Sequence, residues 1–173
     1  MSTNATKPAS PVNPADIVRQ ASVNRSQARL AAVQALYQMD LAATDLNTVI
    51  AEFERHRFGA GGEDDATAGA DAAMFSDLVR GVVARQKEID PLLDGQLAAG
   101  WRLDRIDSIL RALMRAAVYE FLAKERVPAR VVLNEYVEIA KAFFEGDEPK
   151  VANAVLDKLA KKLRAGEFGG AAG

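Results

Sequence analysis

Basic and aromatic side chains occur together at two places in this sequence, and the first lies near its start. Arg25 and Arg29 stand four residues apart, so they share one face of a helix, and Tyr37 follows farther along. Cations of this kind neutralise phosphates, and aromatic rings stack on unpaired bases, a combination that binds single-stranded RNA. Because Tyr37 also falls on an apolar helical stripe, packing in the core is the alternative for its ring.

The second place surrounds a turn in the C-terminal part of the sequence. Phe143 and Phe144 precede the turn at 145–148, and Lys150 follows it at the start of the last predicted helix. The first N–H groups of a helix lack partners within the helix and favour anions. Phe143 lies on an apolar stripe, so the core is the alternative for it, whereas Phe144 lies off the stripe and its exposure would be more informative.

Cysteine and histidine, which many nucleophilic and metal sites require, are almost absent. The sequence has no cysteine and one histidine, His56, which has no partner in an HExxH or HxxxH motif. The GAGG segment at 59–62 lacks the spacing of a dinucleotide-binding loop, and no P-loop motif occurs. We therefore expect a binding protein that is not an enzyme and has no metal site or cofactor, with His56 at its surface.

The formal net charge of −2 conceals an uneven distribution. Residues 1–39 carry four bases and one acid, whereas residues 40–77 carry nine acids and two bases. A basic start beside an acidic middle can present one patch to a polyanion while the total stays near neutral. The alternative is a solvated tail that happens to lack acids.

A third charged segment, predicted to be helical over 102–115, mixes both signs. Its charged residues are Arg102, Arg105, Arg111 and Arg115 beside Asp104 and Asp107. Mixed charge on a helical face suits a protein–protein surface, and a solvated face with intrahelical pairs is the alternative.

Helical periodicity runs through most of the chain, and no segment alternates as a strand would. Residues 1–24 hold three prolines among small polar residues, which predicts a flexible N-terminal arm. We expect one all-helical domain over 25–164, with Ser26 capping its first helix, and a disordered tail over 165–173. Apolar stripes predict about six to seven helices, with a kink or break at Pro91 in the third.

Membrane spans and export signals are also missing from the sequence. No apolar run approaches the roughly 18 residues that a spanning helix needs, and the N-terminus lacks the apolar core of a signal peptide. We therefore expect a cytoplasmic protein that does not contact a membrane.

Four segments, read in order, carry a family resemblance: AVQALYQMDL (32–41), ILRALMRAAVYEF (109–121), VPARVVLNEYVEIAKAFF (127–144) and KVANAVLDKLAKKLR (150–164). Each alone is mostly a helix-packing pattern, but together they span roughly 25–164 and resemble the NusB family of bacterial antitermination factors. Trp101 and the GDEP segment at 146–149 resemble alphaproteobacterial members. The resemblance implies an all-α fold of two small helical bundles packed across each other.

The resemblance also implies a function and a set of contacts. Such proteins bind boxA RNA of ribosomal RNA operons together with NusE, a small-subunit ribosomal protein, and meet other Nus factors and RNA polymerase indirectly. Contact with NusE would fall on the central helices, with Asp104 and Arg111 as candidates. Carried over by position, the residues that would contact RNA are Arg25, Arg29, Tyr37, Phe143, Asp147, Lys150 and Val151.

The sequence departs from the family pattern at two of these places. Ser26 and Gln27 stand where relatives often have further arginines, and Val151 stands where many have a phenylalanine that could stack on a base. We therefore expect lower RNA affinity or greater dependence on NusE. We also expect Arg29→Ala to weaken RNA binding without unfolding the protein.

Two other functional classes remain open alternatives at this point. One is a helical protein-interaction adaptor that does not bind RNA directly. The other is the RNA-binding module of a ribosomal RNA cytosine methyltransferase, but the sequence holds no catalytic cysteine and no nucleotide-binding glycine loop. The resemblance leaves monomer and homodimer equally open.

Overall fold

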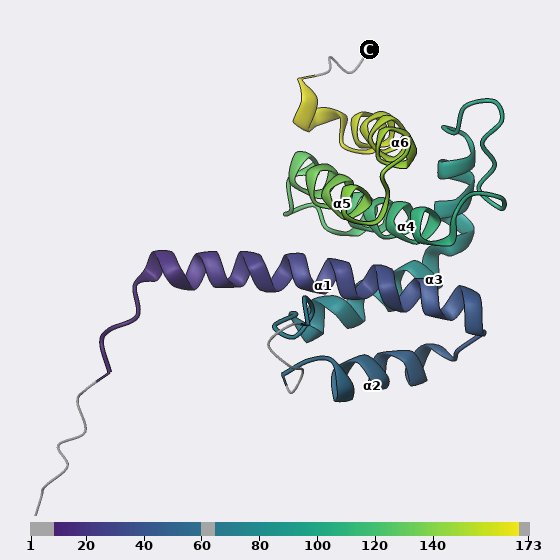
Figure 1. Ribbon diagram of the computed structural model, residues 1–173. Helices are drawn as coiled ribbons and strands as arrows, with labels where there is room; N and C mark the ends of the chain where they lie inside the picture. Colours follow the sequence, from purple (N-terminus) through teal and green to yellow (C-terminus); the bar gives the residue numbers. More distant parts are fainter. Residues whose placement is uncertain (1–8, 60–64, 170–173) are drawn as a thin grey trace, which may run out of the picture.

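A computed structural model describes residues 9–59 and 65–169, and within these ranges the chain is helical with no strand (Figure 1). The elements are α1 (Pro14–Ala42), α2 (Leu46–His56), α3 (Ala72–Asp94), α4 (Ser108–Ala123), α5 (Ala129–Phe143), α6 (Glu148–Leu163) and a short 3₁₀ helix, η1 (Ala165–Phe168).

The helices form two small bundles, which confirms the predicted fold class. One consists of α1, α2 and α3, and the other of α4, α5 and α6 (Figure 1). The two bundles join where α4 packs against both α1 and α3. No helix in the described part of the chain is long and apolar enough to cross a membrane.

Local sequence signals account for most helix starts. Asp45, Asp71 and Asp107 each precede a helix and accept hydrogen bonds from N–H groups of its first turn. These carboxylates satisfy donors that have no partner within the helix and oppose the positive end of its dipole.

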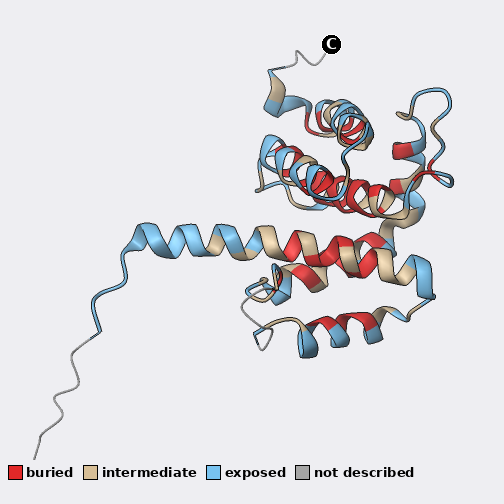
Figure 2. Ribbon diagram, in the orientation of Figure 1, coloured by how far each residue is buried: buried red, intermediate tan, exposed pale blue. Residues whose placement is uncertain are grey.

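The first helix begins much earlier than the sequence predicted. Asn13, not Ser26, caps α1, since its side chain accepts from the N–H of Ala15, and Pro14 occupies the first turn, where its fixed φ suits a helix. Residues 14–24, expected in the flexible arm, are therefore helical. They project from the body with most side chains exposed (Figure 2). Residues 1–8 of the predicted arm lie outside the described range.

The middle of the chain differs from prediction at two helix ends. Pro91 lies inside α3, which continues to Asp94, and Asp90 caps no new helix. Conversely, α4 begins only at Ser108, because Asp107 caps it, and the segment 102–107 forms turns. Asp104 therefore does not share a helical face with Arg111.

The core is centred on α4, which is buried along nearly its whole length (Figure 2). Small residues allow close approach to it, and Gly81 of α3 is one that cannot be replaced freely. A Cβ atom at Gly81 would overlap the ring of Tyr119. Alanines contribute the same advantage on α1, where Ala28, Ala32 and Ala35 are fully buried.

The expected C-terminal tail is structured over the residues that the structure describes. Arg164 is buried and donates to four carbonyl oxygens of residues 120–127, which include the uncapped carbonyl end of α4. Glu167, in η1, accepts from the N–H of Ala129 at 3.0 Å and pairs with Arg164 at 2.7 Å. One buried guanidinium and its carboxylate partner thus hold the end of α4 and the start of α5.

Candidate nucleic-acid interface

The two predicted cations of α1 have different environments. Arg25 is exposed on the part of α1 that leaves the body, whereas Arg29 is 2 % exposed. The guanidinium of Arg29 makes a bidentate contact with Glu120 of α4, with Nε and one terminal nitrogen each donating at 2.9 Å.

Arg29 belongs to a buried network that excludes it from phosphate contact. The Tyr136 hydroxyl donates to Glu120 at 2.6 Å, and Glu135 lies 3.8 Å from the Arg29 guanidinium. Burial and the neighbouring Glu120 charge raise the pKa of Tyr136 well above 10, so Tyr136 keeps its proton and remains a donor. The prediction that Arg29 contacts RNA is therefore corrected, because its donors are already committed to a buried carboxylate.

Tyr37 and Phe143, predicted from separate segments, line one groove. This Tyr37–Phe143 groove, of about 440 Å³, lies among α1, α2, α4 and the end of α5. Phe143 is 40 % exposed, so the alternative that its apolar stripe places it in the core is wrong. Phe144, which lies off the stripe, is partly buried and packs against the core. Arg57 stands at the rim, with its guanidinium 4.6 Å from the centre of the Phe53 ring.

Asp147, Lys150 and Val151 line a second groove, across the α5–α6 turn from Phe143. This groove, of about 320 Å³, lies between α6, as far as Lys158, and the α3–α4 connection, where Trp101 forms part of its wall. We call it the Trp101 groove. Asp147 precedes α6 without a side-chain capping bond, and Lys150 is exposed. The helix end therefore keeps N–H groups and a cation directed to the outside.

Two shallow hollows connect the exposed part of α1 with the start of α6. One includes Ser22 and Ser26, which flank Arg25, and reaches Glu138 of α5. The other starts from Glu138 and ends at Lys150. The predicted RNA residues other than Arg29 thus lie on or beside a chain of neighbouring depressions.

The candidate partner residues Asp104 and Arg111 line one hollow, but their side chains differ in exposure. Arg111 is mostly buried, binds Asp40 of α1 at 3.2 Å and donates to the carbonyl oxygen of Leu103. Asp104 is exposed and pairs with Arg102 at 3.3 Å. Arg111 therefore joins the bundles, and Asp104 is the member of the pair that can reach a partner.

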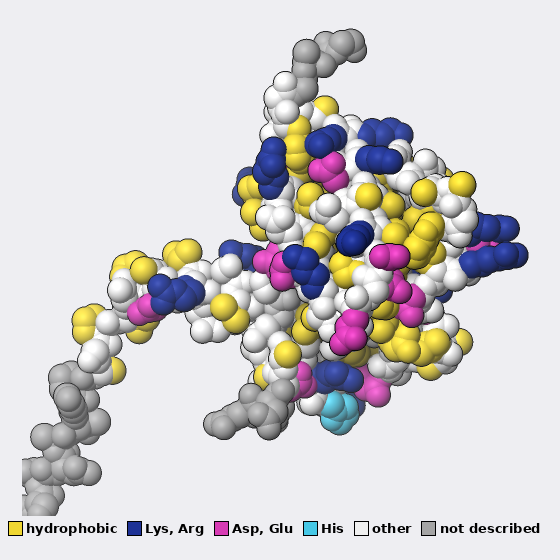
Figure 3. All heavy atoms as spheres, turned by 45° about the horizontal axis from the view of Figure 1, so that its top comes forward, with side chains coloured by type: hydrophobic (Ala, Val, Ile, Leu, Met, Phe, Trp, Pro, Cys, Tyr) yellow, Lys and Arg dark blue, Asp and Glu magenta, His cyan; other side chains and the backbone are white. Residues whose placement is uncertain are grey.

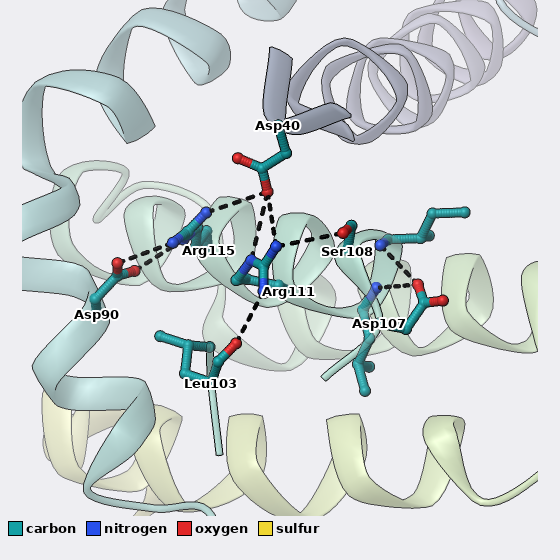
Figure 4. Close-up of polar contacts among 9 residues, drawn as sticks. Asp40, Asp90, Leu103, Asp107, Ser108, Arg111 and Arg115 are labelled. Atoms are coloured by element: carbon teal, nitrogen blue, oxygen red, sulfur yellow. Dashed lines mark hydrogen bonds and ion pairs between the residues drawn. The ribbon is translucent and has the colours of Figure 1, made fainter. Parts of the chain in front are cut away.

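Arg115 lies beside Arg111, and we call the cluster of Asp40, Asp90, Arg111 and Arg115 the polar junction. The Arg115 guanidinium binds Asp90 of α3 in a bidentate contact at 2.8 and 2.9 Å and lies 3.6 Å from Asp40 (Figure 4). One carboxylate of α1 and one of α3 thus hold two arginines of α4, and these contacts join the two bundles.

Sequence reasoning missed Trp101 and Arg57 as groove residues. Trp101 was noted only as a family variant, although a lone tryptophan after Gly100 in a connecting segment is a signal that could have found it. His56 is exposed (Figure 3), and no cluster of metal-ligating side chains occurs in the ranges 9–59 and 65–169.

Comparisons with known proteins agree with the fold. The NusB family model matches residues 26–161. The transcription antitermination protein NusB of Bartonella tribocorum is 55 % identical over 140 residues, which is 81 % of this chain and 90 % of that protein. The Rhodopseudomonas palustris (strain BisB18) protein of the same name is 55 % identical over 144 residues, covering 83 % of this chain and 85 % of that protein.

Two solved structures are similar over most of the chain. A crystal form of T. maritima NusB has a TM-score of 0.67 and 27 % identity, and covers 83 % of this chain and 96 % of its own. A chain in a structure described as a plectonemic RNA supercoil has a TM-score of 0.66 and 25 % identity, covering 80 % of this chain and 95 % of its own.

Proposed function

This chain belongs to the NusB family, and from that premise we propose that it is a transcription antitermination factor. In this function it binds the boxA element of ribosomal RNA operon transcripts together with NusE. Other Nus factors and RNA polymerase are met indirectly, in the cytoplasm, and the protein carries out no chemical step itself. The family match over residues 26–161, with relatives 55 % identical, is the observation that carries the proposal.

The exposed side chains support an RNA surface that runs from α1 to α6. Arg25 and Lys150 provide charge for phosphates, and Tyr37 and Phe143 provide rings for stacking. Asp147 and Val151 complete the surface at the start of α6. Arg29 supports it from below, because its pairing with Glu120 fixes α1 on α4.

Contact with NusE is proposed at the polar junction, where Asp104 is exposed beside the committed arginines. A carboxylate at the rim of an interface steers a partner and adds selectivity more than affinity. Arg111 contributes there by holding Asp40 and the Leu103 carbonyl in place.

A titration of labelled RNA tests the proposal. An oligonucleotide carrying boxA and a scrambled one of equal length are titrated with the protein, with and without NusE, and fluorescence anisotropy reports binding. We expect the boxA oligonucleotide to bind more tightly than the scrambled one, and more tightly still with NusE.

A contrary result would favour the other functional class. If NusE binds but neither oligonucleotide does, with or without NusE, the protein is a helical adaptor that acts without direct RNA contact. If the two oligonucleotides bind equally in the presence of NusE, the assignment of boxA as the target is wrong.

A further inference from the structure

We propose that the Trp101 groove holds one unpaired base of the bound RNA, with the Trp101 indole stacked on the base and Lys158 contacting a neighbouring phosphate. The inference rests on the proposed RNA-binding function and adds these two residues to its site.

One face of α6 forms a side of the groove. The residues on it recur at intervals of three and four positions, as residues on a single face of a helix do. They are Asp147, Lys150, Val151, Ala154, Val155 and Lys158. Val155 is buried and forms the floor, whereas Lys150 and Lys158 are exposed at the rim. The two cations therefore stand about 12 Å apart along the axis, at 1.5 Å per residue, with an apolar strip between them.

The opposite side of the groove is formed by a tight turn that positions Trp101. The N–H of Trp101 donates to the carbonyl oxygen of Ala98 at 3.0 Å, which closes a four-residue turn. Gly100 has φ +91°, a conformation that side chains rarely adopt, and a Cβ there would meet nothing within 4 Å. The turn therefore requires glycine at position 100 because of its backbone conformation and not because of a lack of space. It brings the half-buried indole of Trp101 to the groove.

Charge complementarity favours an anionic occupant. Within the described ranges, neither Lys150 nor Lys158 has a carboxylate at ion-pair distance, although Lys161 of the same helix pairs with Asp157 at 2.9 Å. The positive end of the α6 dipole lies beside Asp147 and opposes much of its charge.

The combination of surfaces fits a nucleotide. A flat aromatic ring in the wall and long cations at the rim match a base and its phosphates, because single-stranded RNA is bound by stacking of its bases and neutralisation of its phosphates. A volume of about 320 Å³ is sufficient for a small ligand group, and Gln96 at the rim can bond the edge of a base. This ring also compensates for Val151, which offers no aromatic face.

The single tryptophan of the chain makes a site-specific readout available. Protein labelled with 5-fluorotryptophan has one ¹⁹F resonance, which arises from position 101 even when unlabelled NusE is present. We expect this resonance to shift when the boxA oligonucleotide is added, and to shift less with the scrambled one.

Substitutions test both proposed contacts by anisotropy. Trp101→Leu keeps an apolar side chain but removes the stacking face, and we expect it to weaken RNA binding about tenfold, whereas Trp101→Phe retains part of the affinity. Lys158→Gln should weaken binding a few-fold and reduce the slope of log affinity against log salt by about 0.7. Lys162→Gln, at an exposed α6 lysine that does not line the groove, is the matched control and should bind as the wild type does.

The outcomes separate this inference from the proposed function. If RNA binds but the ¹⁹F resonance stays fixed and Lys158→Gln matches Lys162→Gln, the groove is not a base site although the RNA function stands. If wild-type protein binds no RNA even with NusE, the proposed function fails and this inference fails with it. Thermal melting identifies any loss of fold in Trp101→Leu. If that variant is unfolded, the comparison of Lys158→Gln with Lys162→Gln and the ¹⁹F resonance of the wild type decide whether the groove binds a base.

Discussion

At the scale of single residues, the position of a charge relative to the core determines what it can do. Arg25 and Arg29 are one helical turn apart, yet Arg25 is exposed and Arg29 is enclosed with Glu120 and Tyr136. Removing one partner from a buried pair leaves the other charge without compensation, which costs far more than a lost surface contact. Of these two arginines of the same helix, Arg29 is committed to stability, and only Arg25 is exposed as the proposed RNA contact requires.

Substitution of these two arginines should affect different properties, and the burial of Arg29 replaces the expectation from sequence that Arg29→Ala leaves the fold intact. We expect Arg29→Met to lower the free energy of unfolding by about 3–5 kcal/mol, because the Glu120 carboxylate stays buried without its cation. Arg25→Met should change stability by less than about 0.5 kcal/mol and weaken RNA binding. Urea denaturation and RNA anisotropy on both variants check this. Equal urea midpoints for Arg29→Met and the wild type would contradict the role of the network.

At the scale of elements, several helix ends depend on groups that are distant in sequence. The carbonyl end of α4 is bound by Arg164, and the start of α5 is bound by Glu167, since Pro128 before α5 provides no side-chain cap. The backbone N–H of Ala129, and then the Arg164 guanidinium, lower the pKa of Glu167 below its usual range. The last turn of the described chain thus stabilises the middle of the second bundle.

The Glu167 contact should give the protein a measurable acid sensitivity. Because the pKa of Glu167 is lower in the folded protein than in the unfolded chain, this stabilisation is complete above the unfolded-state value of about 4.3. It is lost as the pH falls through the pKa of Glu167 in the folded protein. At pH 7 we expect Glu167→Gln to lower Tm by about 2–4 °C, the shift for about 1 kcal/mol in a chain of this size. The difference from wild type should shrink below pH 4 in a series of thermal melts, and a difference that is constant with pH would contradict this account.

At the scale of the whole molecule, polar contacts join the two bundles, and the Tyr37–Phe143 groove depends on how the bundles pack. Arg111 and Arg115 of α4 hold Asp40 of α1 and Asp90 of α3 (Figure 4), and these three helices also pack against one another. The Tyr37–Phe143 groove is formed by helices of both bundles. The surface therefore exists only when the bundles are assembled.

Because the whole molecule carries a net charge of −2, RNA affinity should come from local contacts and depend strongly on salt. Each phosphate contact contributes about 0.7 to the slope of log affinity against log salt for a single strand. With Arg25, Lys150 and Lys158 as contacts, we expect a slope near 2, and Arg25→Met should reduce it by about 0.7. Anisotropy titrations over a series of salt concentrations measure it. A slope near zero would show that phosphate contacts do not carry the binding.

Much of the fold could be predicted because its signals are local. Apolar periodicity predicted the helices, although the helix expected over 102–115 begins only at Ser108, where the Asp107 carboxylate accepts from the N–H groups two and three residues later. The early start of α1 had local signals too, in Asn13 and Pro14, but three prolines in a short polar segment favoured a flexible arm instead. The lack of cysteine and of a partner for His56 likewise favoured a binding protein without further structural information.

By itself, then, the sequence determined an all-α chain of the NusB type, with cations and aromatic rings near α1 and around the α5–α6 turn. Only the tertiary structure decided which of them face outward. Arg29 is buried because Glu120, 91 residues away, meets it, and Trp101 belongs to a groove because a turn at Gly100 sets it against α6. A side chain's neighbours come from distant segments, whereas periodicity and capping report only on residues a few positions away.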